Sequence, residues 1–148
     1  MKKMIFILMI PLLCCKSGNY SVAKADQKEQ LVYYSKGPCL GNCPVYDFWV
    51  FKDGTFLYKD ANKSRRNNTV RGRLAPDKVN DLMLFLKTNL EYPTLFRRIR
   101  DKPITILRFE GMEFEYYSTK VDGGLKEADT RMMGMIKRLS LGRRSDDT

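Results

Sequence analysis

The fold is decided by residues 45–58, which read VYDFWVFKDGTFLY. Aromatic and β-branched residues fill the first half of this segment, and such residues predict a β-strand. Successive side chains of a strand point to opposite faces of its sheet. Tyr46, Phe48 and Val50 would therefore share one face, while Asp47 and Trp49 would lie on the other.

A turn follows at once. Asp53-Gly54 separates the first strand from a second β-prone run, Thr55 to Tyr58. An aspartate–glycine pair between two such runs predicts a β-hairpin, because a type I′ turn requires positive φ at both central residues. The segment therefore predicts two antiparallel strands joined by a tight type I′ turn.

Three further β-prone runs flank this hairpin. Leu31 to Tyr34 precedes it, and Ile104 to Phe109 and Met112 to Tyr116 come later, separated by Glu110-Gly111. The last run alternates apolar and acidic residues, which predicts a strand with one solvated face. Another short strand could lie near Val70, within a polar loop.

Two segments have the spacing of amphipathic helices. The first begins at Pro76, a residue suited to the first helical position, and cannot continue through Pro93. The second runs from about Leu125 to Leu139. The residues expected to face the core are Val79, Leu82, Leu86 and Leu90 in the first helix, and Leu125, Ala128, Met132, Met135 or Ile136, and Leu139 in the second.

The order of elements is therefore strand, hairpin, helix, hairpin, helix. Two units of hairpin plus helix predict an α+β fold, with an antiparallel sheet of about four to five strands and both helices on one face. One domain over residues 31–141 suits a chain of this length. The polar residues 142–148 are expected to form a disordered tail.

Composition agrees with a folded domain and narrows its chemistry. Hydrophobic residues make up 43% of the chain and aromatic residues 11%, which argues against global disorder. The sequence contains no histidine. Serine–histidine and cysteine–histidine catalysis, histidine bases and histidine-ligated zinc are therefore excluded.

The N-terminus predicts export. Lys2 and Lys3 are followed by ten uncharged, almost wholly apolar residues, Met4 to Leu13. Ten residues of helix span about 15 Å, roughly half of a membrane core. We therefore interpret the segment as a signal peptide rather than a transmembrane anchor.

The end of this apolar run resembles the bacterial lipobox. If Cys15 is the modified residue, Leu12 lies three residues before it and the small Cys14 directly before it. If Cys14 were modified, those positions would hold Pro11 and the bulky Leu13, which fits worse.

These features predict a signal peptide over residues 1–14, lipids on Cys15 and a flexible polar tether over residues 15–30. The alternative is an ordinary secretory signal cut between Ser21 and Ala25.

The mature chain would be basic. Loss of Lys2 and Lys3 lowers the formal net charge from +10 to +8. Export and the lack of interleaved aromatic residues argue against nucleic acid. We expect a membrane contact through the lipid, and an envelope protein or anionic polymer as partner. The basic stretches are Lys63-Ser64-Arg65-Arg66, Arg71-Gly72-Arg73, and Arg97-Arg98 with Arg100.

One sharp motif precedes the hairpin, Cys39-Leu40-Gly41-Asn42-Cys43-Pro44-Val45-Tyr46. Together with the signal peptide and the strands that follow, it resembles an uncharacterised bacterial envelope lipoprotein family with the pattern Gly-Pro-Cys-Phe-Gly-x-Cys-Pro-x-Tyr. Leu40 stands where that family usually has Phe. The resemblance covers Leu31 to Leu139 and implies an exported domain of unknown function, with no activity attached.

Three interpretations of Cys39 and Cys43 stay open. A structural disulfide is favoured, because exported compartments are oxidising. A copper(I) site could add thioethers from Met132, Met133 or Met135, although methionine at helical spacing usually belongs to a core. A redox-active dithiol normally lies at a helix N-terminus, whereas a proline and a strand follow here.

Carboxylates are the remaining candidates for catalysis: Asp101, Glu110, Glu113 and Glu115. Glu113 and Glu115 would lie on one strand face about 7 Å apart, near the spacing of glycosidase pairs. Alternating glutamates are also ordinary residues of a solvated strand. We expect no enzyme activity, no catalytic residue, no metal and no cofactor.

Trp49 and Tyr117 could line a ligand groove, but we favour a role in covering the second face of the sheet. The expected protein is a non-enzymatic binding or structural module, lipid-anchored in the bacterial envelope. The outer membrane is favoured over the inner, with the domain facing the periplasm or the cell surface. The alternative is a periplasmic thiol-redox or copper(I)-handling protein that uses Cys39 and Cys43.

Overall fold

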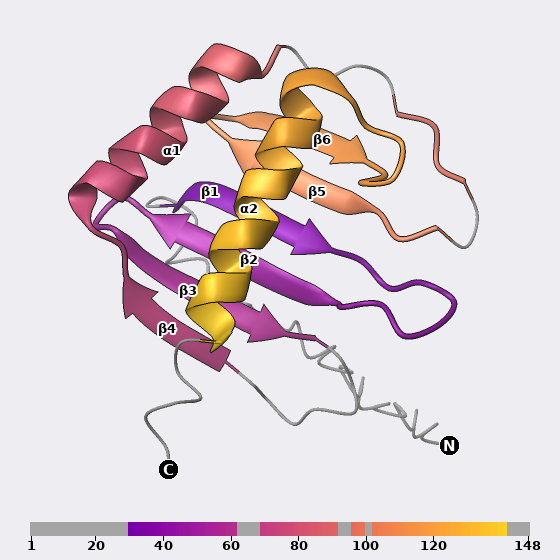
Figure 1. Cartoon of the computed structure of the whole chain (residues 1–148), viewed down its shortest axis with the longest axis horizontal. Helices are drawn as coiled ribbons and strands as arrows, with labels where there is room; N and C mark the ends of the chain where they lie inside the picture. Colours follow the sequence, from indigo (N-terminus) through magenta and orange to yellow (C-terminus); the bar gives the residue numbers. More distant parts are fainter. Residues whose placement is uncertain (1–29, 62–68, 92–95, 100–101, 142–148) are drawn as a thin grey trace, which may run out of the picture.

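The computed structural model describes residues 30–61, 69–91, 96–99 and 102–141, and these residues contain six strands and two helices. The predicted α+β class is confirmed (Figure 1). The elements are β1 (Gln30–Lys36), β2 (Tyr46–Phe51), β3 (Thr55–Asp60), β4 (Thr69–Arg73), α1 (Pro76–Asn89), β5 (Thr105–Phe109), β6 (Met112–Tyr116) and α2 (Gly123–Leu141).

Several predictions concern residues outside this part of the chain. The signal peptide, Cys15, the tether before Gln30 and the tail over 142–148 all lie outside the described residues. Within the described residues, neither helix is long and apolar enough to cross a membrane.

The described strands form one antiparallel sheet in the order β4-β3-β2-β1-β5-β6. β1 lies between the two predicted hairpins and pairs with β2 on one side and β5 on the other. The sheet has more strands than expected because β4 pairs with β3 along its whole length, from Thr69 to Arg73. Main-chain hydrogen bonding to β3 thus extends the sheet through residues whose polar side chains predict mostly loop.

The two hairpins are present, but the predicted turn type is wrong for β2–β3. Of Asp53 and Gly54, only the glycine has positive φ, 80°. The Asp53 carboxylate instead accepts hydrogen bonds from the Thr55 N–H at 2.9 Å and the Thr55 hydroxyl at 2.6 Å. The turn itself is closed by the backbone, because the Gly54 N–H donates to the Phe51 carbonyl at 2.9 Å, and its central residues are therefore Lys52 and Asp53. The β5–β6 turn has positive φ at both Glu110 (48°) and Gly111 (78°), as type I′ requires.

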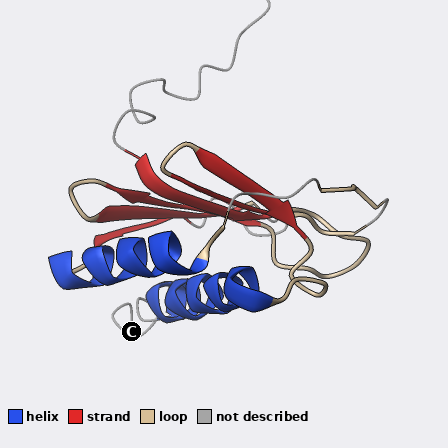
Figure 2. Ribbon diagram, turned by 90° about the horizontal axis from the view of Figure 1, so that it is seen from above, coloured by secondary structure: helices blue, strands red, loops and turns tan. Residues whose placement is uncertain are grey.

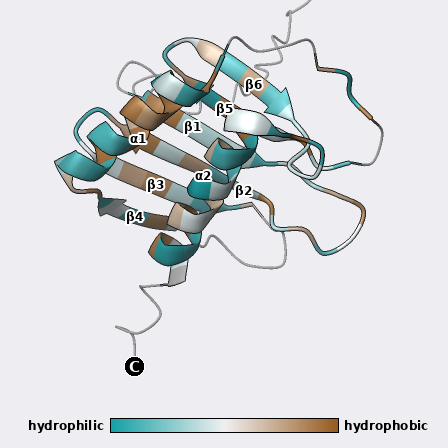
Figure 3. Cartoon of the chain, turned by 45° about the horizontal axis from the view of Figure 1, so that its top comes forward, coloured by the Kyte–Doolittle hydropathy of each residue, from teal (hydrophilic) through white to brown (hydrophobic). Residues whose placement is uncertain are grey.

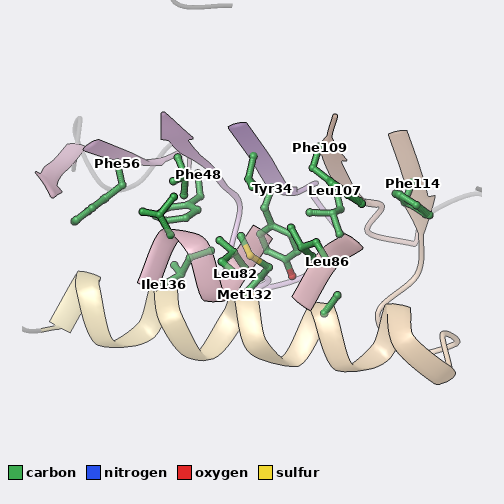
Figure 4. Packing of buried hydrophobic residues seen from close by; sticks show 14 of the residues in the cluster. Tyr34, Phe48, Phe56, Leu82, Leu86, Leu107, Phe109, Phe114, Met132 and Ile136 are labelled. Carbon is green, nitrogen blue, oxygen red and sulfur yellow. The ribbon is translucent and has the colours of Figure 1, made fainter. Parts of the chain in front are cut away.

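Both helices cover the same face of the sheet, as predicted (Figure 2). Tyr34 in β1 pairs with Phe48 of β2 and Leu107 of β5, and all three side chains are buried beneath the helices. Leu86 of α1 and Met132 of α2 pack against this layer (Figure 4). The middle of α1 is the more hydrophobic part of the helix layer (Figure 3).

The helices meet where α1 ends and α2 begins. α2 starts at Gly123, slightly earlier than predicted, and Gly124 lies against the backbone of Asn89. A Cβ atom at Gly124 would collide with the Asn89 carbonyl oxygen. Glycine is therefore required for this close approach.

Candidate functional site

The motif Cys39 to Tyr46 lies mostly in the loop between β1 and β2. Cys39 and Cys43 form a disulfide, with their Cα atoms 5.9 Å apart. This is the arrangement that the structural-disulfide interpretation requires. The Gly37 N–H donates to the Ile104 carbonyl at 2.8 Å, so the start of the loop is also tied to the segment before β5. We call residues 37–45 the stapled loop.

Leu40 lies inside the stapled loop and is strongly exposed. Its side chain is 80% exposed, more than any other large hydrophobic residue of the described chain. The next residue, Gly41, has a φ of 130°, a conformation that L side chains rarely adopt. The disulfide and this backbone geometry hold an apolar side chain in water.

A buried polar cluster lies at the base of the loop. Lys36, the last residue of β1, places its Nζ atom 3.1 Å from Oδ1 of Asp129 in α2. The same carboxylate accepts hydrogen bonds from the hydroxyls of Tyr34 at 2.6 Å, Tyr116 at 3.0 Å and Ser118 at 2.9 Å. Lys36 also contacts the Ser118 hydroxyl. We call these five residues the Lys36–Asp129 cluster.

Three segments of the chain supply this cluster. Tyr34 and Lys36 come from alternate positions of β1, Tyr116 ends β6, and Asp129 lies on the buried side of α2. Thr105 of β5 supports the cluster through a 2.8 Å hydrogen bond with Ser118. The cluster therefore holds α2 to the β1-β5-β6 side of the sheet, beside the stapled loop.

Sequence reasoning did not find this cluster. Its one signal is Asp129, an acidic residue directly after Ala128 in the apolar stripe of the second helix. An acidic residue on a core-facing stripe indicates a buried partner. The sequence does not show which cation or hydroxyl fills that role, because Lys36 and Tyr34 lie 93 and 95 residues away from Asp129.

Burial controls the protonation of the cluster. Burial lowers the pKa of Lys36, and the Asp129 charge and hydrogen bond oppose this shift. Burial raises the pKa of Tyr34 and of Tyr116 far above the ordinary tyrosine range, and the negative charge of Asp129 raises both further. The two phenols therefore stay protonated at any physiological pH and continue to donate hydrogen bonds to Asp129.

Each polar side chain of the cluster has a partner within it. No buried side-chain nitrogen or oxygen among the described residues lacks a hydrogen-bond partner. A serine–lysine pair would need a neutral lysine as proton acceptor for the serine. Here Asp129 engages the Lys36 ammonium, so the arrangement suits a structural clamp.

A family model described as a domain of unknown function, DUF6438, matches residues 30–139. The chain belongs to the DUF6438 family. The match begins with β1 and ends in the last turns of α2, so the DUF6438 domain comprises the whole sheet, both helices and the stapled loop. Comparisons with curated proteins and with solved structures give no significant match.

The candidate carboxylates of the DUF6438 domain are used in surface ion pairs. Glu110 pairs with Lys87 at 2.6 Å, Glu115 with Arg98 at 2.7 Å, and Glu113 with Arg108. Asp101 lies outside the described residues. Within the described part of the chain, no three His, Cys, Asp or Glu residues gather as metal ligands would.

The two aromatic residues considered for a groove differ in position. Trp49 lies on the sheet face away from the helices, with its ring 5.5 Å from that of Tyr33. The Arg108 guanidinium lies over the Tyr33 ring, 5.0 Å from its centroid. Trp49, Tyr33 and Arg108 therefore form a row of side chains that covers this face. Tyr117 is not exposed: it is buried beside Phe96, with ring centroids 4.8 Å apart.

The other residues considered, a methionine for copper binding and the basic stretches, do not belong to the stapled loop. Met132 is wholly buried in the core of the DUF6438 domain, which is its usual role at helical spacing. Arg71 and Arg73 lie on the edge strand β4, whereas residues 63–66 and 100 lie outside the described chain.

Proposed function

We propose that this protein is a lipid-anchored lipoprotein of the bacterial cell envelope whose DUF6438 domain binds a partner protein and catalyses no reaction. The observation that carries the binding proposal is Leu40, 80% exposed within a loop closed by a disulfide. The partner we propose is an envelope protein with an apolar pocket that receives this side chain.

When a partner covers a large apolar side chain that is exposed to water in the free protein, the free energy of the complex is lowered. Ordering a loop at an interface normally opposes binding, and a loop that is already rigid avoids most of that cost. The disulfide and the Lys36–Asp129 cluster at the loop's base provide this rigidity before any partner arrives.

The anchoring part of the proposal comes from the sequence. The signal peptide, the lipobox-like Leu12 to Cys15 and the polar residues to Gln30 suit a domain tethered by lipids on Cys15. One acyl chain binds a membrane only marginally, and two or three make attachment stable. We place the protein in the outer rather than the inner membrane, with its domain in the periplasm or on the cell surface.

We propose that the domain catalyses no reaction because its candidate carboxylates are engaged in ion pairs. Glu110, Glu113 and Glu115 are each paired with a basic side chain, and Asp129 engages Lys36. A general base must be able to take a proton from substrate. None of these four carboxylates is left unpaired for that task.

Photo-crosslinking in intact cells tests the binding proposal. A photoreactive amino acid is placed at Leu40 of the full-length protein, and at Leu84, a 66% exposed leucine on α1, as the control. We expect one discrete protein adduct from position 40 that is lost when Cys39→Ser and Cys43→Ser are introduced. Identical adducts from both positions, or none from position 40, would contradict the proposal.

A further inference from the structure

The two helices diverge from the point where they meet. α1 and α2 are in contact at Asn89 and Gly124 and separate toward the start of α1 and the end of α2 (Figure 1). A groove of about 490 Å³ lies between them in the separated half. This volume falls in the range of small-molecule sites, roughly 300–1,000 Å³. We call it the helix groove.

Apolar side chains from both helices line the helix groove. Leu82 of α1 and Leu74 just before that helix are buried in the core, while Met135 and Leu139 of α2 remain partly exposed. The groove therefore offers an apolar surface that the described chain does not fill. Covering such a surface with a hydrocarbon chain is favourable in proportion to the area removed from water.

Basic side chains surround this surface. Lys78 of α1 and Arg131 and Arg138 of α2 lie at the groove and are exposed, and Asp81 is the one carboxylate among the lining residues. No ion pair joins any of the three cations to another residue of the described chain. The Arg131 guanidinium lies 4.3 Å from the centre of the Phe85 ring, which positions it across the gap from α2 to α1.

We propose that the helix groove binds a single-chain anionic amphiphile, with its hydrocarbon tail on Leu74, Leu82, Met135 and Leu139 and its carboxylate or phosphate head beside the three cations. The unpaired cations favour a negative head, because guanidinium groups bind such oxygens through paired hydrogen bonds. The apolar lining favours a tail over a free anion. The small volume favours one chain over a docked protein domain.

The binding test uses residues 15–148, exported with a cleavable secretory signal and carrying Cys15→Ser, so that no detergent is needed to keep the protein soluble. The probe is dodecyl phosphate below its micellar concentration, followed by calorimetry and by two-dimensional amide NMR. The comparison probes are dodecyltrimethylammonium and inorganic phosphate. We expect saturable binding of dodecyl phosphate, with amide shifts on both helices, and at least tenfold weaker binding of the other two.

Matched variants assign the binding to the helix groove. Arg138→Glu should weaken dodecyl phosphate binding about tenfold through loss of a charge-assisted contact, whereas Lys137→Glu, the same charge change one residue away, should change it less than about twofold. Met135→Gln should weaken binding more than Met133→Gln, because Met133 does not line the groove. Circular dichroism checks that each variant is folded.

Four results would overturn this proposal. Equal binding of the cationic amphiphile would remove the charge argument, and equal binding of inorganic phosphate would leave an anion site without a tail. Equal losses for Arg138→Glu and Lys137→Glu would indicate general electrostatic attraction. A stable dimer in solution that Arg138→Glu dissociates would assign the groove to a second copy of the chain.

Discussion

Lys36 and Asp129 form a buried ion pair across 93 residues of sequence, with side chains only 10% and 4% exposed. The pair connects the end of β1 to the first half of α2 beside the stapled loop. It therefore links the core of the domain to the surface where we propose that a partner binds.

Asp129→Asn should destabilise the domain by about 3–5 kcal/mol, because it leaves the buried Lys36 charge without its partner. Urea denaturation measures the loss. Adding Lys36→Met should recover roughly 1 kcal/mol or more, since no buried charge then remains. Glu113→Gln, which breaks an exposed pair, is the control and should cost less than about 1 kcal/mol. Equal costs for Asp129→Asn and Glu113→Gln would contradict the role assigned to the cluster.

Stability should fall above pH 10, because tyrosines with raised pKa stay protonated in the folded state and ionise in the unfolded state. The Tyr116 contribution is complete below the unfolded pKa of 10.0 and is lost as pH rises beyond it. Tyr116→Phe should reduce the slope of unfolding free energy by about 1.4 kcal/mol per pH unit. Denaturation between pH 9 and 11 tests this, and an unchanged slope would refute it.

Lys36 acts in the opposite direction over a different range. Its lowered pKa means that the folded state releases its proton first, so stability gains from Lys36 as pH rises toward 10.5 and changes no further above it. Lys36→Met should remove this gain while leaving the decline above pH 10.5. A variant with the same pH profile as the wild type would show that Lys36 keeps its ordinary pKa.

Gly124→Ala should cost about 1–3 kcal/mol, because the added Cβ would collide with the carbonyl oxygen of Asn89 and force the helices apart. Gly134→Ala on the same helix is the control, since nothing lies within 4 Å of the position of its Cβ. That change should stabilise the protein by roughly 0.5–1 kcal/mol. Thermal melting of both variants measures the contrast, and a neutral Gly124→Ala would disprove the close approach.

Cys39→Ser should lower stability by roughly 2 kcal/mol with the fold retained, since the disulfide closes a short loop. Far-ultraviolet circular dichroism should be unchanged, while the urea midpoint falls. Loss of the folded spectrum would mean that the disulfide is required for folding itself.

The sequence predicts the parts of this fold that depend on local periodicity. Alternation over Met112 to Tyr116 and the helical spacing after Pro76 predict elements that the structure confirms. β4 is harder, because its side chains are mostly polar and its pairing with β3 supplies the stabilisation. The predicted type I′ turn between β2 and β3 is wrong because the Gly54 N–H donates to the Phe51 carbonyl, which makes Lys52 and Asp53 the central residues. The Asp53 carboxylate then accepts hydrogen bonds from Thr55.

The candidate site is predicted only in part. The motif around Cys39 and Cys43 is visible in sequence because it is continuous, and so is Leu40 within it. The Lys36–Asp129 cluster and the helix groove depend on which face of α2 meets which strand, and that is a property of the assembled fold. Short-range patterns carry no information about such pairings.

We propose that the protein is a domain with a stapled loop, anchored by lipid on Cys15. The most direct test is the intact mass of the protein extracted from membranes and alkylated without prior reduction. We predict a chain that begins at Cys15, carries a lipid adduct and has no alkyl group on Cys39 or Cys43. An unlipidated chain cut between Ser21 and Ala25 would contradict the anchor. Alkyl groups on both loop cysteines, or a bound copper ion, would contradict the disulfide and favour thiol-redox or copper(I) handling.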